Sequence, residues 1–167
     1  MNKFKPLVTL LVFLAPLISD AQQHSPVASE SRDASLAYVG SSNFIVASVV
    51  NKCADSFRGG KSAKEFTLEW QERNAKYVVA AAVYMDKRLA EALVDGGPEE
   101  RKAVFDEVTS VSREYGKETL QGLFENGSKQ EACDRVLGLI GDGVFDITPK
   151  VPMYDELEAL TTWAQQQ

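Results

Sequence analysis

The chain has 167 residues, 44% of them hydrophobic, and a formal net charge of −6, which suits one domain with a sizeable core. An acidic domain is repelled by phosphate backbones and anionic headgroups, so the charge argues against a nucleic-acid partner. One histidine and two cysteines are too few ligands for a typical zinc site, and we expect neither a metal nor a cofactor.

The first 21 residues have the pattern of a secretory signal peptide. A short basic start runs into an apolar stretch at 7–19, and small residues lead up to Ala21. We expect cleavage between Ala21 and Gln22. Thirteen helical residues reach only ~20 Å of the ~30 Å hydrocarbon core, so a membrane anchor is the weaker alternative. Without the leader's two lysines and one aspartate, the net charge of the mature chain becomes −7.

Residues 22–40 follow the leader, and we expect a flexible lead-in there because the run 22–34 is polar and lacks periodicity. The helical domain is predicted to cover 41–167. Its first helix has an apolar face in which residues recur at i, i+3, i+4, i+7 and i+11. That face consists of Val46, Val49, Val50, Cys53 and Phe57, and the glycines at 59–60 end the helix.

The second helix begins at the capping-box sequence Ser62-Ala63-Lys64-Glu65, in which the serine and the glutamate satisfy free backbone amides reciprocally. We expect it to run unbroken to the glycines at 96–97 as the longest element. Its stripe consists of Phe66, Trp70, Tyr77, Ala81, Tyr84 and Arg88.

The third helix is predicted to begin at Pro98, because proline suits the first position of a helix. Gly116 is expected to kink it, and the Asn126-Gly127 pair ends it. Its stripe consists of Val104, Val108, Val111 and Tyr115.

Two further helices are expected. A second capping box, with Ser128 and Glu131, begins a short helix that carries Cys133 on its apolar face. An extended connection at 144–152 leads to a final helix with Tyr154 and Trp163. These aromatic side chains either dock on the core, which we favour, or face a partner.

The sequence therefore predicts an all-α bundle of four or five helices. Cys53 and Cys133 both lie on apolar helix faces, and an even cysteine count in an oxidising compartment predicts one disulfide between them. Two buried free thiols are the alternative.

Polar residues interrupt the apolar stripe of the second helix at its most aromatic part. Arg73 and Asn74 share one helical face with Trp70 and Tyr77, and their burial without partners would cost several kcal/mol. One interpretation is a ligand pocket walled by Trp70 and Tyr77, in which Arg73 binds an anionic group. The favoured alternative is an internal network. There Arg73 pairs with Glu107 or Glu114, and Asn74 bonds a backbone carbonyl.

Cys53 followed by W-x-x-R-N at Trp70, Arg73 and Asn74 resembles a group of small exported helical proteins of Gram-negative bacteria, over the first two helices. The architecture is similar, more loosely, to periplasmic immunity proteins that block toxic amidases. These resemblances imply a periplasmic or secreted protein and, from architecture alone, a protein partner.

Catalytic sets are sparse. The single histidine, His24, lies in the predicted lead-in, which argues against a histidine-based relay. The pairs of neighbouring carboxylates resemble solvated helix faces; they are Glu99/Glu100, Asp106/Glu107 and Asp155/Glu156. We therefore predict a non-enzymatic module that binds another protein, as an interaction or inhibitor type. A small-ligand binder with the Trp70–Tyr77 pocket is the alternative, and a carboxylate-based hydrolase is the weakest hypothesis.

Overall fold

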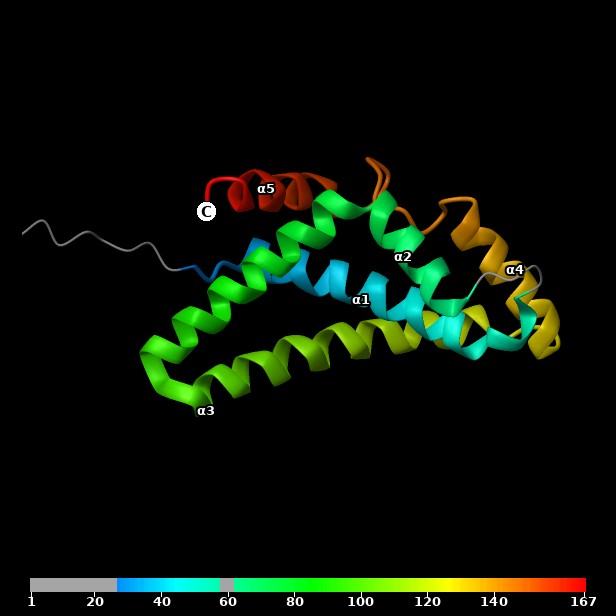
Figure 1. The fold of residues 1–167 in the computed structure, drawn as a ribbon, viewed down its shortest axis with the longest axis horizontal. Coiled ribbons are helices and arrows are strands. Elements are labelled where there is room, and N and C mark those ends of the chain that lie inside the picture. Colours follow the sequence, from blue (N-terminus) through cyan, green and yellow to red (C-terminus); the bar gives the residue numbers. More distant parts are fainter. Residues whose placement is uncertain (1–26, 58–61) are drawn as a thin grey trace, which may run out of the picture.

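The computed structural model describes residues 27–57 and 62–167, and over these ranges the chain is an all-α bundle with no strand (Figure 1). This confirms the predicted fold class. The leader with its cleavage site, His24 and the glycines at 59–60 lie outside the described residues. The elements are α1 (Glu30–Lys52), the 3-10 turn η1 (Ala54–Ser56), α2 (Ala63–Arg73), α3 (Ala75–Leu123), α4 (Lys129–Gly141) and α5 (Tyr154–Ala164).

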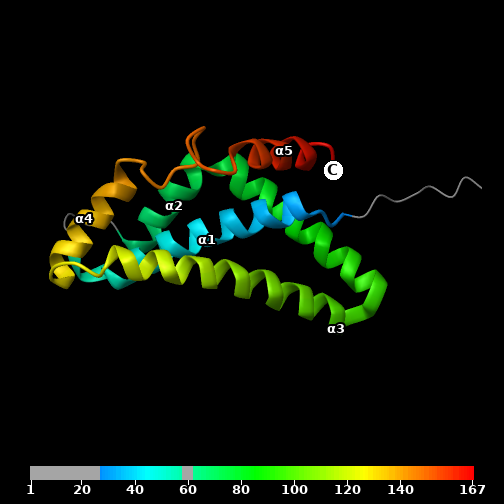
Figure 2. The ribbon, with the colours of Figure 1, turned by 180° about the vertical axis from the view of Figure 1, so that it is seen from behind.

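Helix α3 is bent into a V, and α1 lies between its two arms in both views (Figures 1 and 2). The bend is at Gly97, whose φ of 73° and ψ of −163° suit only glycine. Pro98 then opens the second arm, as predicted. We call residues 75–96 the N-terminal arm and residues 98–123 the C-terminal arm.

The predicted unbroken helix from Ser62 to the bend is wrong, because the helix breaks at Asn74. This residue has φ −107° and ψ 19°, and it ends α2 and precedes α3. Its side-chain Nδ2 donates to the Trp70 carbonyl at 2.8 Å, an acceptor that its own backbone N–H shares. An asparagine that bonds the backbone locally in this way competes with the helical ladder.

The lead-in prediction for 22–40 is also wrong from residue 30 onward, because α1 begins at Glu30. Ser29 caps the helix by accepting a hydrogen bond from the Arg32 N–H at 3.3 Å. Tyr84 anchors the same segment, since its hydroxyl donates to Asp33 and accepts from the Ser29 N–H. The first turns of α1 are rich in alanine and serine, so they lack a strong apolar stripe.

The core has two connected parts. One joins the first half of α1 to the N-terminal arm and α5, and it contains Tyr77, Ala81 and Tyr84. The other joins the second half of α1 to α2 and α4, and it contains Trp70. The predicted disulfide between Cys53 and Cys133 lies in this second part, fully buried, with a Cα–Cα distance of 5.5 Å.

Helix α5 docks on the core, as favoured from the sequence. The Trp163 ring meets the Tyr84 ring edge-on with centroids 5.4 Å apart, and Tyr154 meets Tyr77 in the same way at 6.5 Å. Such edge contacts add to the stabilisation from buried area.

The predicted kink at Gly116 is wrong, because within α3 only Gly97 departs from helical geometry. Gly116 instead allows α1 to come close. A Cβ atom added there would lie 2.5 Å from the Phe44 ring, and one added at Gly40 would lie 2.5 Å from Ser112 Oγ. These two contacts set α1 and the C-terminal arm side by side and parallel.

Gly116→Val is therefore expected to lower the free energy of unfolding by about 1–3 kcal/mol, because the added methyl groups overlap the Phe44 ring. Gly122→Val is the matched control, since nothing lies within 4 Å of a Cβ at Gly122. Urea denaturation followed by circular dichroism measures both variants. Equal losses of stability would show that the close approach is unimportant.

Candidate functional site

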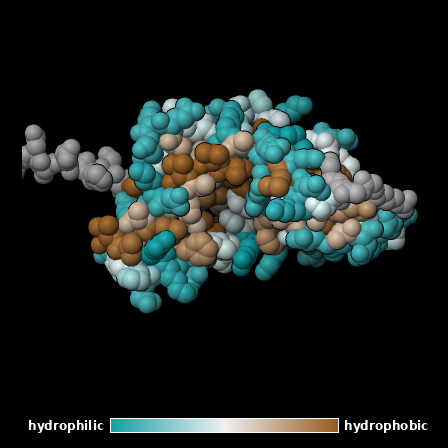
Figure 3. All heavy atoms as spheres, viewed as in Figure 1, coloured by the Kyte–Doolittle hydropathy of each residue, from teal (hydrophilic) through white to brown (hydrophobic). Residues whose placement is uncertain are grey.

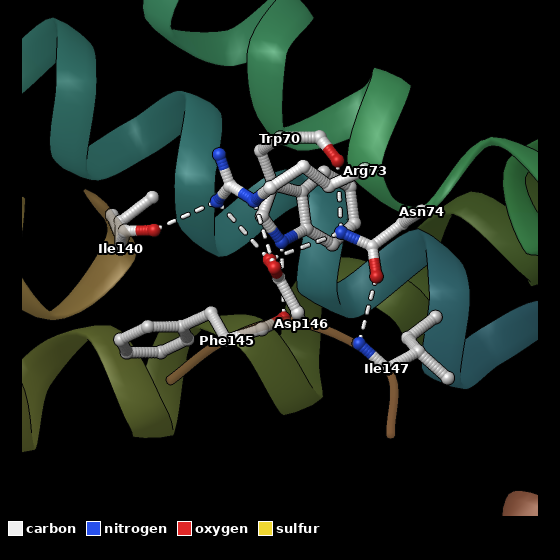
Figure 4. Close-up of polar contacts among 7 residues, drawn as sticks. All are labelled: Trp70, Arg73, Asn74, Ile140, Phe145, Asp146 and Ile147. Atoms are coloured by element: carbon white, nitrogen blue, oxygen red, sulfur yellow. Dashed lines mark hydrogen bonds and ion pairs between the residues drawn. The ribbon is translucent and has the colours of Figure 1, made fainter. Parts of the chain in front are cut away.

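The residues that interrupt the stripe form a network with the connection between α4 and α5, residues 142–153 (Figure 4). Arg73 donates from Nε to Asp146 Oδ2 at 2.7 Å and from Nη2 to Asp146 Oδ1 at 3.1 Å. The same Nη2 reaches the Ile140 carbonyl at 2.7 Å. The hydrogen bond to Asp146 raises the pKa of Arg73.

Asn74 and Trp70 also hold the connection 142–153 in place, through hydrogen bonds to residues 145–147. Asn74 Nδ2 donates to Asp146 Oδ1 at 3.2 Å, and Asn74 Oδ1 accepts from the buried Ile147 N–H at 2.7 Å. Trp70 Nε1 donates to the Phe145 carbonyl at 3.0 Å. The last turn of α2 and its C-cap residue therefore hold the connection in place.

The structure thus brings Trp70, Arg73 and Asn74 together with partners inside the protein, as in the internal-network interpretation. The carboxylate is Asp146, so the predicted partners Glu107 and Glu114 are wrong. Asp146 takes this role because the connection folds back across the end of α2. None of the residues of the predicted pocket lines the large cavity described below.

Tyr77 belongs to a different contact, between α3 and α5. Its hydroxyl donates to Glu158 Oε1 at 2.5 Å, and Lys76 Nζ reaches the same oxygen. The hydrogen bonds from Lys76 and Tyr77 lower the pKa of Glu158, while burial and the bond to Glu158 raise the pKa of Tyr77. These contacts hold α5 against α3.

A cavity of about 990 Å³ lies where α1 runs beside the C-terminal arm. The connection 142–153 forms its other wall, and we call it the α1–α3 groove. On the face drawn in Figure 3, apolar side chains gather beside a hollow near the middle of the molecule. Apolar residues that line the groove include Ala37, Tyr38, Ile45, Val108, Val111 and Met153.

Charged groups gather toward the start of α1 in this groove. Arg88 lies with its Nε 3.4 Å from Asp33 Oδ1 and its Nη1 3.6 Å from Glu91 Oε2. Arg88 Nε and Glu91 Oε2 are buried and have ion-pair contacts without hydrogen-bond geometry. Burial, followed by the bond to Asp33, raises the pKa of Tyr84 to about 12.

Two further carboxylates of the groove, Glu30 and Glu107, are exposed and pair with no other described residue. Asp146 also lines the groove, but its charge is matched by Arg73. Among the residues that the structure describes, no cluster of histidine, cysteine and acidic side chains could hold a metal ion. The groove is therefore suited to an apolar ligand with positive charge.

The sequence patterns do not predict this groove. Its α1 wall includes Ala34, Ala37, Tyr38, Ser41 and Ile45, a second face of the helix that is spaced at i, i+3, i+4, i+7 and i+11. Small and hydroxylated residues make up much of that face, so its apolar signal is weak. A search for a second stripe on α1 could have found it.

Comparisons with known proteins identify no relative: no family model, curated protein or solved structure matches the chain. The resemblance carried by Cys53 and the W-x-x-R-N motif stays a prediction. Over 27–57 and 62–167, no helix has the length and apolar character needed to cross a membrane.

Proposed function

We propose that this chain is an exported binding module that holds an apolar segment of another protein in the α1–α3 groove. The observation that carries the proposal is the groove itself, a largely apolar hollow of about 990 Å³ in a small domain. Large apolar concavities with a few polar groups are where small proteins bind partners or ligands.

The walls of the groove are braced before any partner arrives. The disulfide ties the end of α1 to α4, and the Arg73–Asp146 pair fixes the connection 142–153 on α2. The close contacts at Gly40 and Gly116 set the floor. A preorganised site loses less conformational entropy on binding, which favours affinity.

Binding is favoured over catalysis by the placement of the ionisable groups. The side chains with the strongest pKa shifts, at Tyr77 and Tyr84, hold α5 and the start of α1 in place. In the groove, Asp33 and Arg88 face each other. The disulfide is compatible with an oxidising compartment, and the leader pattern leads us to propose the periplasm of a Gram-negative bacterium.

Nile red, a neutral apolar dye, tests whether the groove binds apolar molecules. We expect its fluorescence to rise with the wild-type protein, and its affinity to fall about tenfold in Val111→Trp, a loss of ~1.4 kcal/mol, because the indole fills the groove. Val79→Trp is the control, since Val79 is 59% exposed and lies outside the groove. Thermal unfolding confirms that both variants fold. No dye binding, or binding that Val111→Trp leaves intact, would contradict the proposal.

A further inference from the structure

We infer that the partner segment is a basic amphipathic helix, bound along the α1–α3 groove with lysine or arginine side chains over Glu30 and Glu107. This inference rests on the proposed function, because it names the partner class for the same groove. Three features of the described residues support it: the length of the groove, its parallel walls and its charge.

The groove is long and straight. Its lining residues run along α1 from Glu30 to Ile45 and along the C-terminal arm from Glu107 to Thr119. At 1.5 Å per residue these walls extend ~22 Å and ~18 Å, about three to four helical turns. The shape suits a helix that inserts side chains at i, i+3, i+4 and i+7.

Parallel walls keep the groove uniform over this length. Gly40 lies against Ser112, and Phe44 lies against Gly116, so a step of four residues on one helix matches four on the other. Ser41 Oγ adds a hydrogen bond to the Ser112 carbonyl at 3.0 Å across the same floor. A helix laid in the groove would therefore meet one continuous surface.

The negative charge of the groove indicates that the partner segment is positively charged. Four carboxylates and one guanidinium line it, and two of those carboxylates, Glu30 and Glu107, have no partner among the described residues. The parallel register places Glu107 beside the first turns of α1, so both lie in the same half of the groove. A basic helix would neutralise them, whereas an acidic helix would meet like charges.

The same charge argues against a second copy of this chain as the occupant. The protein carries a net charge of −6, so two copies repel each other at long range. The exposed acids of one copy would also face Glu30 and Glu107 of the other. A partner of opposite charge avoids both costs.

Two synthetic helical peptides of 14 residues test the inference by fluorescence anisotropy with the purified, oxidised protein. Both peptides carry the same leucine stripe, and their polar positions are all lysine in one and all glutamate in the other. We expect the lysine peptide to bind at least about tenfold more tightly, with an affinity that falls as salt is added.

Charge variants locate the contact. Combining Glu30→Gln and Glu107→Gln is expected to weaken the lysine peptide about fivefold, because two carboxylates facing the bound cations are lost. Combining Glu72→Gln and Glu125→Gln is the matched control, since both residues are exposed, lie outside the groove and change the net charge equally. The control should leave the affinity within about twofold.

The failures of the two proposals are distinguishable. Equal affinity for the two peptides, or equal effects of the two double variants, would overturn the basic-helix inference. The proposed function would still stand if Val111→Trp blocks Nile red. Binding of dodecyltrimethylammonium without binding of either peptide would assign the groove to small cationic amphiphiles and would also overturn the inference. Self-association through the groove, seen by analytical ultracentrifugation, would likewise overturn the inference.

Discussion

Replacing Cys53 and Cys133 together by alanine is expected to lower the free energy of unfolding by about 2–5 kcal/mol. The disulfide closes a loop with a sequence separation of 80, and the chain-entropy model gives ~4–5 kcal/mol for a loop of that length. Both residues are also fully buried, so the removed sulfur atoms leave space in the core. Urea denaturation measured by circular dichroism gives the difference.

Dithiothreitol provides the control for this prediction. It should destabilise the wild-type protein and leave the alanine double variant unchanged, because that variant has no disulfide to reduce. Wild type and double variant unfolding at the same urea concentration would contradict the role given to the crosslink. Thiol labelling of the unfolded, unreduced protein should find no free cysteine.

Asn74→Ala is expected to lower the free energy of unfolding by about 2–4 kcal/mol. The substitution leaves the Ile147 N–H, which is buried, without its acceptor, and an unsatisfied buried donor costs ~1–3 kcal/mol. It also removes the bonds to Asp146 and to the Trp70 carbonyl and opens a small cavity at a residue that is 1% exposed. Urea denaturation again provides the measurement.

Asn51→Ala is the matched control, because Asn51 lies exposed in α1 and should change stability by less than about 0.5 kcal/mol. The loss at Asn74 should also loosen the connection 142–153, which hydrogen exchange at the Ile147 amide would detect. If the two alanine variants are equally stable, the network is not what holds the connection.

Local signals explain what could be predicted from the sequence. The capping boxes at Ser62 and Ser128 need only residues three positions apart, and the structure has both. Spacing on one helix face likewise identifies Val46, Val49 and Cys53 as core residues. The disulfide followed from two such faces and the predicted compartment.

Long-range partners explain what could not be predicted. At the break, Asn74 bonds locally to the Trp70 carbonyl but also to Asp146 and Ile147, which are more than 70 positions away. The residue types Arg73 and Asn74 indicated that partners must exist, but spacing within one helix cannot say where they are. The predicted partner Glu107 is instead an exposed residue of the groove.

The groove could not be predicted from the sequence for a related reason. It is formed where the faces of α1 and the C-terminal arm diverge above their contact at Gly40 and Gly116. From the sequence alone, Gly116 predicts a kink, because its use as a contact surface depends on Phe44 of another helix. Small residues carry little periodic signal even where they determine how closely two helices pack.

Mapping the lysine peptide by two-dimensional ¹H–¹⁵N NMR tests the central claim, that the α1–α3 groove is the binding surface, most directly. We predict that the shifted amides fall at 30–45 and 107–119, the two helical walls of the groove. The bend of α3 offers a contrasting surface, because Leu93, Val94 and Phe105 are exposed there. Shifts confined to the bend, or spread over the surface without a cluster in the groove, would contradict the claim.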